Sequence, residues 1–450
     1  MKTTLKTLPL LFALVAAGLQ APAFAKGGDA GKLDGALNPM GGERAANADG
    51  SIPAWDGGLK PGSLAASANG NYSDPFAAEK PLMVISAANA EQYKDLLTPG
   101  QAAMLKRFPT YTLNVYPSHR TARMPDEVNK ATRANAGGVT LADGGYGLKG
   151  YNAGVPFPMP TEPLEVMWNH MARYVGASLQ REMASATVEA NGSASLITYA
   201  QSVHWRAAFS DLQADENVLY YSLIRALSPS RVAGEITMVH DPINQVLSAR
   251  DAWQYIPGQR RVRRAPTVAY DSSARYSYGQ LTSDGVGGFN GAPDRYDWKL
   301  IGKQERLIPY NSYKLASKSL KYADILKPNY LDAQYVRYEK HRVWVVEATL
   351  KPGTRHIYGK RRFYIDEDNW QVASSEMYDS RGELWRMYEN YPMQLPDVDV
   401  PFPAMDATYD LISGRYTTNF MTNEYQQKMV FNETTTKDYY SPAALRRYGK

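Results

Sequence analysis

Residues 341–389 constrain the fold more than any other part of the chain, because they read as consecutive strands separated by short polar turns. The segments are rich in β-branched and aromatic residues, and turn residues such as Ser380-Arg381-Gly382 lie between them. Neighbouring strands with such short connections can pair only as an antiparallel meander. The predicted strands are His341–Leu350, Arg361–Asp366, Trp370–Tyr378 and Glu383–Glu389.

The composition also favours extended sheets. The chain of 450 residues has 32 tyrosines and 35 glycines, and 44% of its residues are hydrophobic. Aromatic residues suit strands and glycine suits turns, so we expect a mainly antiparallel β protein of the α+β class. Asn191-Gly192 indicates a hairpin, because both residues tolerate positive φ. Further strands are predicted over Glu182–Glu189, Ser195–Arg206, Leu219–Leu227, Val232–Val239, Gln245–Tyr255 and Tyr296–Asn311.

Two helices are indicated by their start signals. Thr98 before Pro99 is typical of an N-cap followed by the first helical residue, and this helix is expected to run through Lys106. Thr161 precedes a second helix, whose hydrophobic stripe should pack against the sheet. The stripe consists of Leu164, Met167, Trp168, Met171 and Val175.

Two regions rich in glycine and proline are expected to lack regular structure. Residues 26–88 are interpreted as an extended N-terminal arm, attached through Ile52, Trp55 and Phe76. Residues 134–163 are expected to form a long surface loop. The predicted organisation is a leader at 1–25, the arm at 26–88 and one domain at 89–450, in which 134–163 is inserted and 390–450 is a C-terminal extension.

The first 25 residues have the features of a secretory signal peptide. Lys2 and Lys6 form a basic start, Leu8–Leu19 is an apolar run, and Ala23–Ala25 has the small-x-small pattern of a cleavage site. No later segment approaches the roughly 20 apolar residues of a transmembrane helix. The chain has no cysteine, so it has neither disulfides nor a lipobox thiol. We therefore expect a periplasmic protein that is not a lipoprotein.

The stretch Trp253–Pro266 combines large rings with a cluster of positive charge. Trp253 and Tyr255 lie on one face of a predicted strand, because they are two residues apart. Four arginines follow, and they can bind phosphate or carboxylate groups bidentately. One interpretation is an apolar concavity with a basic rim, and the other is a core strand that ends in a solvated turn. The arginines are Arg260, Arg261, Arg263 and Arg264.

Enzymatic motifs are scarce. The sequence has no G-x-S-x-G motif, and its six histidines form no H-E-x-x-H motif. Gly145–Gly150 matches G-x-G-x-x-G, but no strand leads into it and prolines follow where a helix should begin. Asp366-Glu367-Asp368 lacks the ligand spacing of a calcium loop and is expected to be a solvated turn. We therefore predict no catalytic residue, metal or cofactor, although a carboxylate pair assembled in space stays open. The net charge of +5 is too small to indicate nucleic acid.

Several motifs resemble a known family. The motifs are Asn38–Trp55, Val115–Arg120, Trp253–Pro266 and Ile308–Asn311. Together they resemble the bacterial domain-of-unknown-function family 1329, which is in turn similar to periplasmic lipoprotein-localisation carriers of the LolA and LolB type. The resemblance implies a strongly curved, half-open β-barrel with helices covering its concave side. It also implies transport of lipid-like cargo, often beside exporters of the resistance-nodulation-division (RND) class.

These observations lead to one function hypothesis and two alternatives. We predict a periplasmic carrier for a lipid or another hydrophobic amphiphile, in transient contact with a membrane, with an RND-type transporter or an outer-membrane partner. Thr282–Gly291 is flexible in composition and carries one ring, as a mobile flap would. The predicted ligand-binding residues are Trp253, Tyr255, Phe289, Trp298, Trp344, Trp385, Arg260, Arg261, Arg263 and Arg264. The alternatives are a cell-envelope polysaccharide-binding protein, if the rings form an exposed platform, and a carboxylate-based hydrolase.

Overall fold

The computed structural model describes residues 29–265 and 270–449, so the predicted signal peptide and Pro266 lie outside the described residues. One sheet of sixteen strands dominates the protein. Its strands are β1 (Met83–Ile85), β2 (Leu113–Val115), β5 (Ser178–Val188), β6 (Ala194–Trp205), β7 (Tyr220–Ser228), β8 (Ile236–Asp241), β9 (Asp251–Ile256), β10 (Arg261–Arg264), β11 (Tyr296–Pro309), β12 (Tyr338–Leu350), β13 (Lys360–Asp366), β14 (Val372–Tyr378), β15 (Leu384–Leu395), β16 (Val400–Asp410), β17 (Tyr416–Met421) and β18 (Val430–Phe431).

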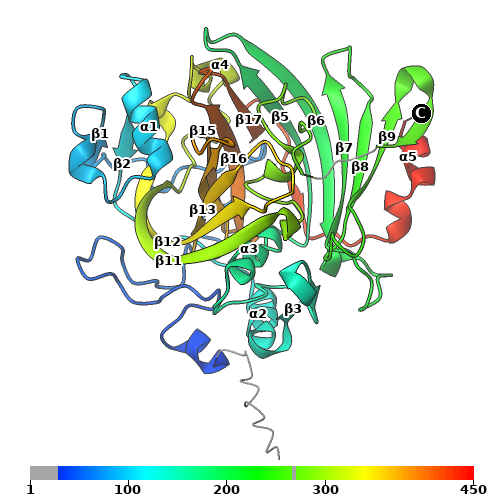
Figure 1. Cartoon of the computed structure of the whole chain (residues 1–450), viewed down its shortest axis with the longest axis horizontal. Helices are drawn as coiled ribbons and strands as arrows, with labels where there is room; N and C mark the ends of the chain where they lie inside the picture. The colour runs from blue at the N-terminus through cyan, green and yellow to red at the C-terminus, as the bar shows by residue number, and fades with distance from the viewer. Residues whose placement is uncertain (1–28, 266–269, 450) are drawn as a thin grey trace, which may run out of the picture.

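The sheet is curved and does not close. Its strands run in the order β1-β2-β12-β13-β14-β15-β16-β17-β5-β6-β7-β8-β9-β10, with β11 paired to β12 and β18 paired to β5 (Figure 1). Neighbours pair antiparallel, apart from a short parallel contact between β2 and β12 at Val115 and Tyr338. Two small strands, β3 (Thr140–Leu141) and β4 (Leu148–Lys149), form a separate ribbon. The prediction of a mainly antiparallel sheet is therefore confirmed.

The strands predicted at 341–389 form the central meander β12 to β15. Two bounds differ clearly from the prediction: β14 begins at Val372 and not at Trp370, and β15 extends to Leu395, beyond the predicted end at Glu389. Trp370 has a φ of 59°, a left-handed conformation that belongs to the turn and not to a strand. The predicted hairpin at Asn191-Gly192 joins β5 and β6, and Gly192 has a φ of 88° there.

The helices are few and short. They are α1 (Pro99–Arg107), α2 (Asp126–Gly138), α3 (Pro163–Met171), α4 (Tyr322–Ile325) and α5 (Pro442–Tyr448). Helix α1 begins as predicted, with the Thr98 side chain accepting from the backbone N–H of Gln101 at 3.2 Å and the Gln101 side chain accepting from the N–H of Thr98. No helix of the described residues is long and apolar enough to cross a membrane.

Both faces of the β11–β17 part of the sheet are buried. On one face, α3 contacts β11 and β12, and Trp168 lies in a core with Trp370 and Phe363. On the other face, α1 contacts β14 and β15, and Met104 and Leu105 lie in a second core with Tyr338 and Tyr391. Burial on both faces explains why these strands hold so many fully buried tyrosines.

Helix α2 occupies the start of the region that was expected to be a loop. It spans 126–138, and its buried residues are Val128, Thr132, Asn135 and Ala136. Only two of these four residues are apolar, so the segment carries a weak hydrophobic stripe. The prediction of an irregular surface loop over 134–163 was therefore wrong for its first five residues. The remainder contains the short ribbon of β3 and β4, and its residues Tyr151 and Phe157 are buried in a hydrophobic core.

The N-terminal arm follows an irregular path and contacts the body of the protein. Ile52 is buried, Trp55 donates its indole N–H to the carbonyl of Ala122 at 3.0 Å, and Phe76 stacks on His119 with ring centroids 4.1 Å apart. These are the residues expected to attach the arm. The division of the chain into arm, domain and extension stays a prediction.

Candidate functional site

A cavity of about 330 Å³ lies against one face of strands β5 to β8. Side chains alternate along each strand, and those on the cavity side are largely apolar. On β7, for example, Tyr220, Ser222, Ile224 and Ala226 line the cavity, whereas Leu223 belongs to the core on the opposite face. The other strand residues that line it include Leu179, Met183, Tyr199, Val203, Trp205, Thr237, Val239, Phe402 and Phe420.

The segment 274–290, called the flap below, lies over this cavity. Its residues Tyr276, Leu281 and Val286 are among those that line it. The outer part of the flap is fastened to the residue just before β8, because Arg275 forms an ion pair with Glu235, and the Tyr276 hydroxyl donates to Glu235 Oε2 at 2.6 Å. Further contacts hold the same part of the flap, since Arg231 donates to the Tyr278 hydroxyl at 2.6 Å and Arg386 donates to the carbonyl of Gly279 at 2.8 Å. Glu235 is the carboxylate among these outer contacts.

The inner part of the flap is anchored in the protein core. Asp284 accepts from Arg361 Nη1 at 2.8 Å and lies 3.1 Å from His356 Nε2. Burial alone would raise the pKa of Asp284, but Arg361 and His356 lower it to about 2, so the ion pair persists at physiological pH. Phe289 is fully buried, 5.5 Å from Trp298 between ring centroids. Phe289, the ring of the predicted mobile flap, therefore anchors the flap in the core.

Four arginines line the cavity, and they fall into two pairs. Arg250 and Arg275 are neutralised by carboxylates: Arg250 lies 2.6 Å from Asp241, and Arg275 contacts Glu235. Arg173 and Arg181 form no ion pair with a carboxylate within the described residues. Arg173 Nε and Arg181 Nη1 are buried without a hydrogen-bond partner there. Positive charge is therefore present inside the cavity, where the sequence suggested only a basic rim.

The predicted aromatic residues of β9 face away from the cavity. Trp253 pairs with Met238 and Tyr255 pairs with Ile236, so both rings lie on the outer face of the sheet. There they pack in a small core with Tyr440 and Leu445 from the C-terminal segment. The expectation that these rings line a concavity does not match the structure, because α5 covers the face on which they lie.

The other predicted rings lie in the β11–β15 part of the sheet. Trp298, Trp344 and Trp385 are half-buried and pack against the same core, in which Phe289 is fully buried. Trp298 donates its indole N–H to the carbonyl of Pro293 at 2.7 Å, and Trp385 donates to Asp410 Oδ2 at 2.9 Å. The structure therefore brings Phe289 and Trp298 together, but it separates this group from Trp253 and Tyr255. The rings form neither one cavity wall nor one exposed platform.

The four clustered arginines are exposed at the end of the sheet. Arg260 lies in the turn before β10, and Arg261, Arg263 and Arg264 lie on that strand. Strand β10 pairs only with β9 among the described strands, so it is an edge. Charged side chains on an edge strand discourage pairing with another chain, and this structural role fits the position of these residues. No described residue of β10 lines the cavity.

A second hollow of about 320 Å³ lies between the arm and residues 311–337. Two of its charged groups are paired with each other, since Arg337 Nη2 lies 2.7 Å from Glu79 Oε2. Two of its rings, Phe76 and Tyr116, already contact a cation, because the Arg337 guanidinium lies over both. The hollow is therefore a weaker candidate than the cavity under the flap.

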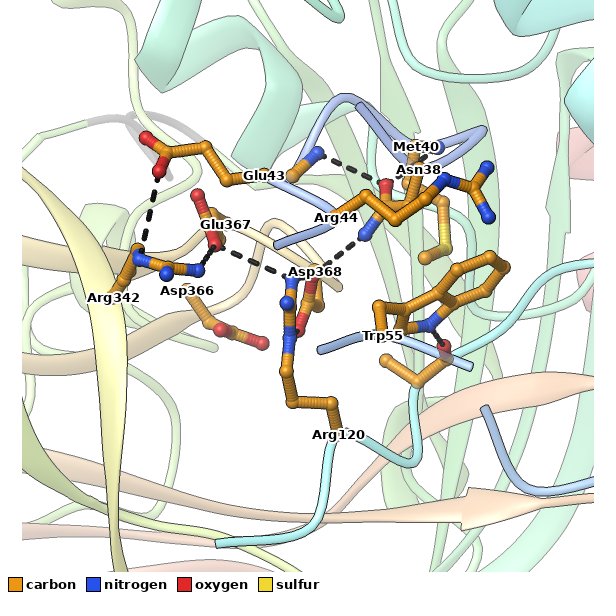
Figure 2. A network of polar contacts seen from close by, with 12 residues as sticks. Asn38, Met40, Glu43, Arg44, Trp55, Arg120, Arg342, Asp366, Glu367 and Asp368 are labelled. Carbon is orange, nitrogen blue, oxygen red and sulfur yellow. Dashed lines mark hydrogen bonds and ion pairs between the residues drawn. The ribbon is translucent and has the colours of Figure 1, made fainter. Parts of the chain in front are cut away.

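The acidic turn at 366–368 is buried, which corrects the expectation of a solvated turn. Asp366, Glu367 and Asp368 are each 1% exposed. Arg120 binds Asp368 with two hydrogen bonds, from Nε at 2.8 Å and from Nη2 at 2.7 Å, and Asn38 of the arm donates to Asp368 Oδ1 at 2.7 Å (Figure 2). The partners come from residues far away in the sequence, so the turn alone could not reveal them.

The same turn contributes to a group with metal-ligand chemistry. His341, Asp366 and Asp368 each offer one ligand atom, and these atoms lie within 4.8 Å of one another. Arg120 and Asn38 already occupy the oxygens of Asp368, so a cation would compete with them. Burial, together with the charge of Asp368, raises the pKa of Asp366 to about 7. We interpret the group as a buried polar network that holds the arm against the sheet.

Sequence reasoning missed the residues that form the cavity. Arg173 and Arg181 are single arginines in an ordinary helix end and strand, and no cluster marks them. Alternation along β5 and β6 does separate two faces, but it does not say which face is concave. A weak signal was available, because Arg181 interrupts the otherwise uncharged side of β5 that carries Leu179, Met183 and Ser185.

Comparison with known families gives one clear match. The family model described as "Protein of unknown function (DUF1329)" matches residues 84–446. An uncharacterized protein of Pseudomonas aeruginosa is 48% identical over 455 residues, and the alignment covers all of both chains.

Three solved structures show partial likeness, each over 63% of this chain. A DUF1329 family protein from Desulfovibrio piger is 15% identical, with a TM-score of 0.43 over 100% of its own chain. A putative outer membrane lipoprotein-sorting protein domain from Vibrio parahaemolyticus is 15% identical, with a TM-score of 0.42 over 97% of its chain. A LolA superfamily protein from Nitrosomonas europaea is 13% identical, with a TM-score of 0.37 over 98% of its chain.

Proposed function

The chain belongs to the DUF1329 family of proteins of unknown function, and for this member we propose a carrier function in which a hydrophobic or amphiphilic molecule binds in the cavity under the flap. The observation that supports the proposal is the cavity itself. It has a largely apolar wall on β5 to β8 and a cover, the flap, whose inner part is anchored in the core and whose outer part is held by polar contacts at the cavity edge. In the proposal the protein acts in the periplasm, as its N-terminal sequence predicts.

The energetics favour such a role. Each methylene removed from water contributes about 0.8 kcal/mol, so a chain of about ten methylenes gains on the order of 8 kcal/mol when it enters a dry cavity. The volume of about 330 Å³ lies at the lower end of the roughly 300–1,000 Å³ of small-molecule sites. A cover is needed because the same wall would otherwise expose apolar surface to water when empty.

The flap contacts suggest how a molecule enters. The anchor at Asp284 and Phe289 fixes one end, while the contact of Arg275 and Tyr276 with Glu235 can break without disturbing the core. We propose that opening occurs at Glu235 and that the bound molecule is exchanged there with a membrane partner. In this proposal the membrane partner is an RND-type transporter or an outer-membrane component.

A cavity-filling variant tests the proposal. Ser222 lies on β7 in the cavity wall, and Ser222→Trp would place an indole in the space that the ligand needs. Ser195 lies exposed at the start of β6, so Ser195→Trp is the matched control. We expect the wild type and Ser195→Trp to bind Nile red with a rise in fluorescence, and Ser222→Trp to lose at least tenfold in affinity.

Equal binding by all three proteins would place the probe elsewhere and would contradict the proposal. Thermal unfolding of each variant shows whether the fold is retained. Extraction of the purified wild type with organic solvent, followed by mass spectrometry, provides an independent readout. We expect a lipid-like molecule in the wild-type extract and a lower amount in the Ser222→Trp extract.

A further inference from the structure

Arg181 lies in the cavity wall in an unusual electrostatic setting. It is 8% exposed, and its guanidinium lies over the rings of Phe420 and Phe402, at 4.6 and 5.4 Å from their centroids. Its Nε donates to Gln201 Oε1 at 2.9 Å, but Nη1 has no partner within the described residues. A buried cation normally has a carboxylate partner, because desolvation of an unpaired charge is costly.

Arg173, which lies under the flap, also has a guanidinium nitrogen without a hydrogen-bond partner among the described residues. It follows α3, donates through Nη1 to the carbonyl of His170 at 2.7 Å, and leaves Nε without a partner among the described residues. A Cβ atom built on Gly287 of the flap would lie 3.2 Å from Arg173 Nη2, so this guanidinium lies directly beneath the cover. Arg173 and Arg181 therefore bring two positive charges to one apolar cavity.

One buried acid, Asp406, interacts electrostatically with both arginines but does not fully neutralise them. Asp406 is buried, and its Oδ1 accepts from Asn419 at 2.8 Å, while it forms no ion pair with either arginine. Burial raises the pKa of Asp406 to about 6, so this carboxyl is largely ionised at pH 7, but its single charge can offset only one of the two arginines. Burial also lowers the pKa of Arg181 to about 9, which leaves it protonated at pH 7. The cavity keeps a positive charge that a ligand anion would satisfy.

We propose that Arg181, assisted by Arg173, binds the anionic headgroup of the molecule in the cavity, which makes the ligand an alkyl chain ending in a carboxylate or a phosphate. The inference rests on the proposed carrier function and narrows its ligand class. Arginine presents a planar set of N–H donors that matches carboxylate and phosphate oxygens, and such charge-assisted bonds are about twice as strong as neutral ones. The apolar wall of β6 and β7 then holds the chain.

The other cavity cations serve as an internal comparison. Arg250 and Arg275 lie in the same cavity, but each already has a carboxylate partner, Asp241 and Glu235 respectively. The exposed arginines of β10 lie outside the cavity. Headgroup binding is therefore assigned to Arg173 and Arg181, which have no carboxylate partner among the described residues. The exposed arginines of β10 take no part in it.

Matched ligands and variants test this assignment. Oleic acid, oleoyl lysophosphatidic acid and oleyl alcohol share a chain and differ in headgroup, and each is titrated against Nile red bound to the full-length mature protein. For the wild type we expect both acids to compete at least tenfold better than the alcohol. For Arg181→Gln we expect this preference to fall by about tenfold, because a hydrogen bond to a charged group contributes about 1.5–3 kcal/mol.

The controls separate the two levels of the proposal. A variant with Arg260, Arg261, Arg263 and Arg264 all changed to Gln should keep the wild-type preference. If the wild type binds the alcohol and the acids equally, or if Arg181→Gln keeps the preference, the headgroup assignment is wrong while the carrier function stands. If the wild type binds none of the three ligands, the carrier function itself fails.

Further comparisons distinguish the source of the anion and guard against misfolding. A stronger response to oleic acid identifies a carboxylate site, and a stronger response to lysophosphatidic acid identifies a phosphate site; either result supports the assignment. Should Arg181→Gln fail to fold, Arg173→Gln takes its place, with the same expected loss of preference. If Arg173→Gln keeps the wild-type preference for the acids, the assignment is overturned.

Discussion

Glu389 on β15 allows a quantitative prediction about pH and stability. Its side chain is fully buried and accepts hydrogen bonds from Gln101 Nε2 at 3.1 Å, the Tyr338 hydroxyl at 2.8 Å and the Tyr391 hydroxyl at 3.1 Å. Burial raises the pKa of Glu389 to about 7, and these hydrogen bonds only partly offset the effect. The folded protein therefore keeps a proton on Glu389 at a pH where the unfolded chain has released it.

The sign and size of the effect follow from this difference. A carboxyl with a raised pKa in the folded state costs stability as the pH increases from about 4 to above 7. A shift from 4.5 to about 7 corresponds to about 3 kcal/mol when fully developed, at about 1.4 kcal/mol per unit. Because part of the cost is already present at pH 5, we expect about 2 kcal/mol between pH 5 and pH 8.

Urea unfolding of Glu389→Gln at the two pH values measures this cost. Glutamine does not titrate, so the stability of the variant relative to the wild type should improve by about 2 kcal/mol from pH 5 to pH 8. Any constant loss of hydrogen bonding cancels in this comparison. The exposed Glu383→Gln is the control and should show no such change. A difference between Glu389→Gln and the wild type that is the same at both pH values would refute the reasoning.

Two further predictions concern the arm and the flap. A Cβ on Gly42 would lie 2.5 Å from Asp368 Oδ1 and 2.7 Å from Asn38 Nδ2. Gly42→Ala should therefore destabilise the protein by about 1–3 kcal/mol and expose the arm to limited proteolysis. Gly35→Ala is the control and should do neither, because a Cβ at that position meets nothing within 4 Å. Glu235→Gln removes the charge that holds Arg275. Hydrogen exchange in residues 274–281 should therefore become faster, while the anchor at Asp284 and Phe289 stays protected. Unchanged exchange would show that the flap is held by other contacts.

The local features of the fold were predictable from the sequence. The meander of β12 to β15 follows from alternation and short turns, and α1 follows from Thr98, Pro99 and the side chain of Gln101. Each of these signals is complete within a few neighbouring residues. Helix α2 was missed because its buried side includes Thr132 and Asn135, which carry no hydrophobic signal.

The site depends on contacts that no local pattern contains. Trp253 and Tyr255 do share one face of a strand, as their spacing indicates, but α5 determines that this face is covered on the outside. The turn at 366–368 is buried because Arg120 and Asn38 reach it from more than 200 residues away. Arg181 is a candidate headgroup ligand only because β5 lines a cavity and Arg181 has no carboxylate partner there among the described residues.

The most direct test of the carrier function is to locate a bound molecule in a crystal. Crystals grown with a brominated fatty acid would show the bromine by its anomalous scattering. The account predicts a bromine peak in the cavity between β5–β8 and the flap, with the carboxylate at Arg181. A peak on the outer face near Trp253 and α5, or a cavity that stays empty at saturating ligand, would contradict it.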